Sequence, residues 1–179
     1  MLSALNPDEE SGRRFKFSTK LVHPSIKVVD GNQVKMPDLA ENEFTLLALI
    51  EPCITRKASI RLRMDGIKGW VSVGVAIRRR VEDTSYRFES NSNHGTYQIS
   101  YDGYCWSEDS SANEQYISWY YNEGDIITVS VDPKKKELVF QKGEESASAH
   151  TLTYNVDKKD KLHFCAAVNY CEDSVTLLD

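Results

Sequence analysis

The sequence predicts an all-β fold, either a sandwich or a barrel built from many short strands. Two observations support this prediction. Apolar and polar residues alternate in one segment after another, and Gly, Asn, Asp and Pro gather between these segments. Successive side chains of a strand point to opposite faces, so alternation with a period of two is typical of a half-buried strand. Short strands separated by turn residues, with almost no helical periodicity, are typical of sandwiches and barrels.

The clearest strand is predicted at residues 58–65, where Ala58, Ile60, Leu62 and Met64 share one face and every residue between them is polar. The same alternation recurs at residues 70–77, 97–101, 127–132 and 162–169. Residues 138–140 follow the strand at 127–132 after the polar turn Asp132-Pro133, which predicts a hairpin with Lys134–Lys136 at its tip.

Two segments lack this clear pattern. Residues 1–14 are polar and contain Pro7 and Gly12, so we expect a flexible N-terminal arm followed by a single domain at residues 15–179. Residues 38–50 allow two interpretations. We favour a turn followed by a buried strand at Phe44–Ile50, and a helix is the alternative.

Composition limits the class of partner. The formal net charge is −5, which argues against binding to nucleic acid or to anionic membranes, because phosphate contacts need clustered Lys and Arg. No apolar run approaches the roughly 18 residues of a membrane span. The four cysteines are scattered without a dense framework, which favours reduced thiols and a cytoplasmic or nuclear location.

The order of the strands resembles the SPRY domain family. The resemblance extends from about Phe15 to Asp179 and is carried by six segments in order: Gly69–Ala76, His94–Ile99, Tyr101–Trp106, Glu123–Asp132, Glu137–Gly143 and Leu162–Val168. The sequence departs from the family at Tyr97, where a second Trp is usual, and at Gln141-Lys142-Gly143, where the family has Y-x-N-G. It therefore resembles a divergent member.

The resemblance implies a bent antiparallel β-sandwich of the concanavalin-like type, with loops at one rim that bind a short peptide or a protein surface. It also implies a role as the recognition arm of an adaptor or ubiquitin-ligase assembly. We expect no nucleic-acid or membrane partner and a monomeric domain. Within the fold, Gly74 is expected to let Trp70 or a residue of the facing sheet pack closely on its strand.

For each possible catalytic or metal-binding residue in the sequence, an ordinary structural role is the better explanation. His94 and Cys105 are both expected near the loop rim, but a lone pair in sequence does not make a nucleophile and its base. Cys165 and Cys171 lack the paired short spacings of structural zinc sites. We therefore predict no catalytic residue, no metal and no cofactor.

The candidate partner-binding residues come from two features. Arginines 78–80 end the strand that begins at Trp70, and such a run can bind an acidic peptide or a phosphate. Eight tyrosines and tryptophans crowd into residues 97–121, and these residue types are favoured in binding hot spots. We expect Tyr104, Trp106 and Tyr116 to be exposed at the rim and Trp119 to pack beneath a loop. The predicted set is Arg78, Arg79, His94, Tyr104, Trp106, Tyr116 and Trp119.

A carbohydrate-binding lectin is the main alternative function, because similar sandwiches stack sugars on an aromatic ring. Asn93-His94 is followed by Gly95 rather than by a galectin-like pattern, which makes the lectin the weaker hypothesis. An enzyme ranks third.

Overall fold

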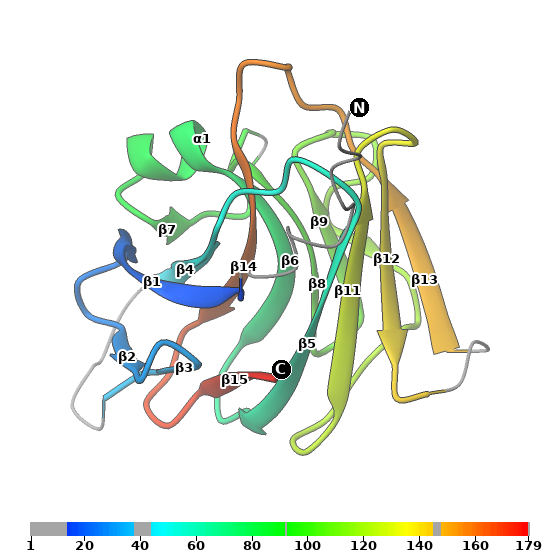
Figure 1. Ribbon diagram of the computed structural model, residues 1–179. Helices are drawn as coiled ribbons and strands as arrows, with labels where there is room; N and C mark the ends of the chain where they lie inside the picture. Colours follow the sequence, from blue (N-terminus) through cyan, green and yellow to red (C-terminus); the bar gives the residue numbers. More distant parts are fainter. Residues whose placement is uncertain (1–13, 38–43, 92, 145–147, 179) are drawn as a thin grey trace, which may run out of the picture.

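The computed structural model describes residues 14–37, 44–91, 93–144 and 148–178. In this part of the chain two antiparallel sheets pack face to face, accompanied by one short helix (Figure 1). The predicted all-β sandwich is confirmed. Residues 1–13 of the expected arm and residues 38–43 of the ambiguous segment lie outside the described residues. The favoured strand forms at Thr45–Glu51, one residue later than predicted, so Phe44 precedes it and is exposed.

Sheet A contains eight strands. Their order across the sheet is β1 (Lys16–Val22), β4 (Thr45–Glu51), β14 (Leu162–Val168), β6 (Val71–Ile77), β8 (Thr96–Ser100), β9 (Tyr104–Ser107) and β10 (Gln115–Tyr116), with β7 (Arg87–Phe88) paired to the start of β4.

Sheet B contains seven strands. Their order is β13 (Ala149–Thr153), β12 (Glu137–Lys142), β11 (Ile126–Asp132), β5 (Ala58–Gly66), β15 (Ser174–Leu178), β3 (Gln33–Lys35) and β2 (Lys27–Val29). The predicted hairpin is β11–β12, and the carboxylate of Asp132 accepts the backbone N–H groups of Lys134 and Lys135 at its turn, at 3.0 and 3.2 Å.

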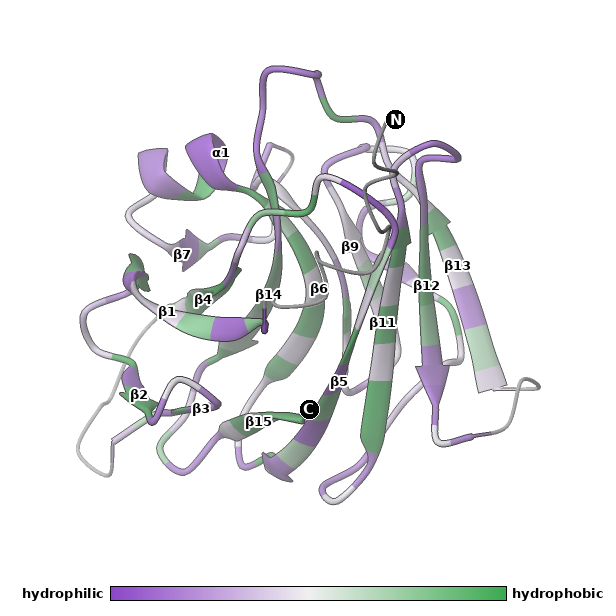
Figure 2. Ribbon diagram, viewed as in Figure 1, coloured by the Kyte–Doolittle hydropathy of each residue, from purple (hydrophilic) through white to green (hydrophobic). Residues whose placement is uncertain are grey.

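The core lies between the sheets because their apolar faces are turned toward each other. In β5, Ile60, Leu62 and Met64 are buried while residues 59, 61 and 63 are exposed. The neighbouring β11 alternates in register with it, pairing Val129 with Ile60, and Figure 2 shows β11 banded green and pale. Each fully buried Leu or Ile side chain contributes about 1.5–3 kcal/mol to stability.

Sheet A differs from sheet B in being buried on both faces at its centre. In β14, Phe164 and Ala166 face the core, whereas Cys165 and Ala167 belong to a second apolar cluster on the outer face. Val81 of the helix α1 (Arg78–Asp83) and Phe88 of β7 join this cluster, so α1 and β7 cover the outer face of sheet A (Figure 1).

The expectation that arginines 78–80 end a strand is corrected by the structure. The strand β6 stops at Ile77 and α1 begins at Arg78. The helix forms because Val81 reaches the apolar outer face of the sheet, while Arg78 pairs with Glu82 one turn later at 2.7 Å.

The expected neighbour of Gly74 is also corrected. A Cβ atom at Gly74 would collide with the backbone carbonyl of Tyr97 and with Gln98, which lie on the adjacent strand β8 and not on the facing sheet. Gly74 therefore allows β6 and β8 to pair closely in the layer that supports the outer face.

We expect Gly74→Ala to lower the free energy of unfolding by about 2–3 kcal/mol, because overpacking must push β8 away from β6. Thr151→Ala, at an exposed position of the edge strand β13, is the control and should change it by less than about 0.5 kcal/mol. Urea unfolding followed by tryptophan fluorescence measures both. A Gly74→Ala protein as stable as the wild type would contradict this account.

Candidate functional site

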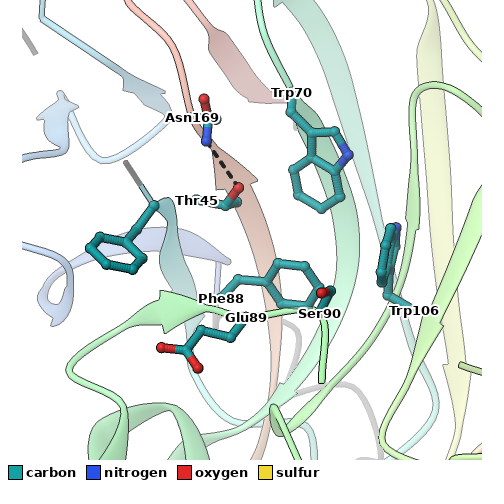
Figure 3. Close-up of a pocket in the computed structure, with 8 residues that line it drawn as sticks. Thr45, Trp70, Phe88, Glu89, Ser90, Trp106 and Asn169 are labelled. Carbon is teal, nitrogen blue, oxygen red and sulfur yellow. Dashed lines mark hydrogen bonds between the residues drawn. The ribbon is translucent and has the colours of Figure 1, made fainter. Parts of the chain in front are cut away.

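A pocket opens on the outer face of sheet A beyond the area that α1 covers. It lies where β4 and β6 begin and β14 ends, so three antiparallel strands bring their termini to the same place. The pocket volume is about 480 Å³, and the residues that line it are Phe44, Thr45, Trp70, Phe88, Glu89, Ser90, Trp106 and Asn169 (Figure 3).

Three aromatic rings form the wall of the pocket. Trp70 and Phe88 are stacked, with centroids 5.4 Å apart and planes 13° from parallel. Trp106 stands edge-on to both, at 5.9 Å from Trp70 and 5.5 Å from Phe88. The indole N–H of Trp106 donates to the hydroxyl of Ser100 at 3.0 Å, so the ring is anchored from behind. The ring of Trp106 is therefore fixed both by this hydrogen bond and by packing against Trp70 and Phe88.

Two tyrosines extend these rings toward the edge of sheet A. The ring centroid of Tyr104 lies 6.2 Å from that of Trp106, and the ring centroid of Tyr116, on the edge strand β10, lies 5.4 Å from that of Tyr104. Exposure rises along this direction, from 9% for Trp106 to 60% for Tyr116. We call Tyr116, Tyr104, Trp106, Phe88 and Trp70 the aromatic row.

The carboxylate of Asp173 positions the end of the aromatic row at Trp70. Asp173 is completely buried. It lies in the turn between β14 and β15 and accepts five backbone N–H groups, at distances of 2.6 to 3.2 Å, from Lys68, Gly69, Trp70, Asn169 and Tyr170. Backbone N–H groups that converge on one point form an anion-binding concavity, which lets the carboxylate stay buried. The Asp173 carboxylate thus joins two turns. One precedes β6 and carries Trp70, and the other follows β14 and carries Asn169.

A second hydrogen-bonded unit holds the opposite side of the pocket. The ring Nδ1 of His94 accepts the backbone N–H of Thr96 at 3.1 Å, so Nε2 carries the hydrogen and donates to Asn113 Oδ1 at 3.0 Å. The side-chain amide of Asn113 donates in turn to the Ser90 carbonyl at 2.9 Å. His94 thus ties the loop after β9 to the segment after Phe88.

Burial lowers the pKa of His94 below its ordinary value of 6.5, and a weaker opposing effect comes from Asn113. His163 is also buried, and burial lowers the pKa of His163 in the same direction. Its Nε2 has no hydrogen-bond partner among the described residues. Both rings are therefore neutral in the folded protein at neutral pH.

Four of the seven residues predicted from sequence gather at this site. Tyr104, Trp106 and Tyr116 belong to the aromatic row, and the His94 ring lies 5.0 Å from Phe88. Of the three aromatics expected to be exposed, Tyr116 is exposed and Tyr104 is half-buried, but Trp106 is buried. Trp106 is covered because Phe88 and Trp70 pack on it and Ser100 binds its N–H.

The other three predicted residues lie elsewhere. Arg78 pairs with Glu82 and Arg79 pairs with Asp160 at 3.0 Å, so both arginines already have acidic partners within the chain. Trp119 donates its indole N–H to the Ser148 carbonyl at 2.6 Å and contacts Phe140 of sheet B. Trp119 was expected to pack beneath a loop, and its half-buried position against the segment before β13 agrees with this.

The pocket also contains residues that sequence reasoning missed, namely Phe44, Phe88, Glu89 and Asn169, together with Trp70, which was considered only as a packing neighbour of Gly74. They come from four separate segments. Phe44 was expected to begin the buried strand at residues 44–50, whereas Phe88 stands among polar residues outside any clear alternation. An isolated aromatic in a polar segment is the only signal that could have marked Phe88.

The described part of the chain contains no group of three or more His, Cys, Asp or Glu side chains arranged to hold a metal ion. The four cysteines are free, and burial raises the pKa of Cys105 to about 11. A thiol with so high a pKa is a poor nucleophile at neutral pH. Among the same residues no helix has the length and apolar character needed to cross a membrane.

Comparison with solved structures shows a SPRY-type fold. The SPRY domain of human HERC1 superimposes with a TM-score of 0.72 at 18% identity, covering 91% of this chain and 97% of that one. The PSpry domain of TRIM65 gives a TM-score of 0.66 at 12% identity, covering 93% of each chain. The NHR1 domain of Drosophila melanogaster neuralized gives 0.60 at 10% identity, covering 92% and 98%. No protein-family model matches the sequence, and neither does any curated protein.

Replacing Asp173 by Asn should lower the free energy of unfolding by about 3 kcal/mol, because an amide offers one acceptor oxygen and turns an N–H toward donors. The near-ultraviolet circular dichroism of the tryptophans should change as Trp70 loses its fixed position. Glu172→Gln, at an exposed position in the same turn, is the matched control. Equal stability of the Asp173→Asn and Glu172→Gln proteins would refute the positioning role.

Stability should fall as the pH drops below the ordinary histidine pKa of 6.5, because the pKa of His94 and that of His163 are lowered by folding. Below that pH the unfolded chain binds protons that the folded protein excludes, so the free energy of unfolding decreases with decreasing pH. His94→Gln should remove on the order of 1 kcal/mol of the change between about pH 7.5 and 5.5. His23→Gln should remove a smaller part of it, because His23 is partly exposed, although burial and the charge of Arg87 lower its pKa in the same direction. Denaturant titrations across this range measure the slope, and an unchanged slope in His94→Gln would show that the ring is not excluded from protonation.

Proposed function

We propose that this chain is a non-catalytic protein-interaction module that binds an extended segment of a partner along the aromatic row and in the adjoining pocket. The observation that carries the proposal is a continuous set of packed aromatic rings on the part of sheet A that α1 does not cover, running from the exposed Tyr116 to the buried Phe88 at the pocket. Tyrosine and tryptophan combine an apolar body with a polar tip, and they dominate binding hot spots for that reason.

The spacing of the rings supports an extended ligand. From Trp106 to Tyr104 to Tyr116 the successive ring centroids are 6.2 and 5.4 Å apart. At the other end Trp70, Phe88 and Trp106 all contact one another, at 5.4 to 5.9 Å, and so form a single cluster. Side chains on one face of an extended chain recur about every 6.6 Å. Alternate side chains of a bound segment can therefore each meet a different ring.

The rigidity of the rings supports the same conclusion. Trp106 is fixed by Ser100, and Trp70 is fixed through the backbone by Asp173. A surface whose side chains are already ordered loses little conformational entropy when it binds. The stacked pair Trp70–Phe88 can thus act as an anchor without rearranging.

We further propose that the module serves as the recognition part of a larger adaptor or ubiquitin-ligase assembly, in the cytoplasm or nucleus. The likeness in fold to the SPRY domain of human HERC1 and to the PSpry domain of TRIM65 supports the first part. The four free cysteines support the second, because reduced thiols are typical of these compartments.

Substituting Tyr104 and Tyr116 together by Ala should reduce partner capture more than about fivefold, because two contact surfaces of the aromatic row disappear. Tyr116 is largely exposed and Tyr104 half-buried, so the melting temperature should change little. Affinity capture from a native lysate with quantitative mass spectrometry measures the loss.

Tyr120→Ala is the control, because Tyr120 is 56% exposed but contacts Lys142 and not the aromatic row. Capture of the same partners by the double variant and the wild type would place the interaction elsewhere. Binding on a glycan array that depends on Trp70 would instead favour the lectin.

A further inference from the structure

We infer that the pocket receives a basic side chain of the partner, with arginine as the best fit; this rests on the proposed function. The methylene stem would lie across the stacked rings of Trp70 and Phe88, and the cationic head would reach the carboxylate of Glu89. Four observations support the inference.

The first is the shape of the pocket. Trp70 and Phe88 form its middle, while the Glu89 carboxylate lies on the side of Phe88 away from Trp106 (Figure 3). An arginine or lysine side chain has the matching layout, because it buries an apolar stem and keeps a charge at its tip. A wholly apolar side chain would leave the carboxylate end without a counterpart.

The second is charge. Glu89 is the only ionisable residue among those that line the pocket. Its carboxylate accepts the side-chain N–H of Asn91 at 3.4 Å but forms no ion pair within the described residues. By contrast, Glu82, Glu108 and Glu123 each have a cationic partner. The net charge of the whole chain is −5, so its field also favours a cation.

The third is the set of hydrogen-bond acceptors. The side-chain N–H of Asn169 donates to the Thr45 hydroxyl at 3.2 Å, and Figure 3 shows the amide oxygen of Asn169 turned away from Thr45, Phe88 and Glu89. The Ser90 hydroxyl also lines the pocket. Guanidinium carries five N–H donors and no acceptor, so it can use the Ser90 hydroxyl together with the carboxylate.

The fourth is an intramolecular cation–π contact at the edge of the pocket, between the side chains of Arg87 and Phe44. The guanidinium carbon of Arg87 lies 5.0 Å from the centroid of the Phe44 ring, which shows that the surroundings of the pocket accept a cation on a π-face. Arg87 is not among the lining residues. The charge of Arg87 must weaken the binding of a second cation. Removing Arg87 should therefore strengthen binding of a basic peptide, whereas removing the charge of Glu89 should weaken it.

The test uses the whole chain and peptides of the form acetyl-Val-Thr-X-Thr-Val-amide, whose β-branched frame favours an extended backbone. X is Arg, Lys, citrulline, norleucine or Glu. Citrulline keeps the shape of arginine and removes the charge. Titration up to about 10 mM peptide, followed by the indole N–H signals of Trp70 and Trp106 in two-dimensional NMR, yields the affinities.

We expect the Arg peptide to bind about fivefold more tightly than the citrulline peptide. Glu89→Gln should abolish this preference, and Arg87→Gln should increase it. Glu144→Gln is the matched control, because Glu144 is exposed and lies outside the pocket, and it should change nothing.

Three outcomes would overturn the inference. These are a preference for the Glu peptide that Arg87→Gln removes, equal affinity for Arg and citrulline, and the absence of any shift at the highest concentration. If partner capture still depends on Tyr104 and Tyr116 in those cases, the proposed function stands and only the basic ligand is wrong. If that dependence is also lost, both fail.

Discussion

The carboxylate of Asp173 accepts backbone N–H groups from two turns that lie about a hundred residues apart, and these turns bring Trp70 and Asn169 into one pocket. A buried carboxylate tolerates loss of water only where donors replace it, and here the backbone supplies five of them. The arrangement joins the start of β6 to the end of β14. Every property proposed for the pocket depends on this junction, because the stacked ring of Trp70 begins there.

The position of the pocket follows from the way sheet A is covered. Its central strands are buried on both faces, so the outer face has a cover, and Val81 of α1 together with Phe88 of β7 provides part of it. Where this cover ends, aromatic rings take its place. Trp106 packs on the sheet beneath it and donates its N–H to Ser100, and the same ring also lines the pocket. Structural cover and binding surface are therefore made by the same side chains.

This dual role explains which of the candidate partner-binding residues lie at the pocket and the aromatic row, and which lie elsewhere. Aromatic crowding at residues 97–121 marked the right region, because that composition suits both cover and contact. The run of arginines 78–80 was a weaker guide, since a charged run shows nothing of its partners. In the folded chain Arg79 meets Asp160, which is far away in sequence. Trp119 belongs to the same crowded segment, but its N–H bond to Ser148 directs it to sheet B.

The sequence by itself determined the class of fold and most of the strands, because period-two alternation is a local property that holds wherever one face of a strand is buried. Residues 58–65 and 127–132 illustrate this, since fully buried positions alternate with more accessible ones along both strands. Only the tertiary structure decided the pocket. Phe44, Trp70, Glu89 and Asn169 come from segments that no local pattern connects, and they meet because antiparallel pairing brings the ends of β4, β6 and β14 together. Contacts of that kind depend on strand order and register, which alternation along a single strand does not encode.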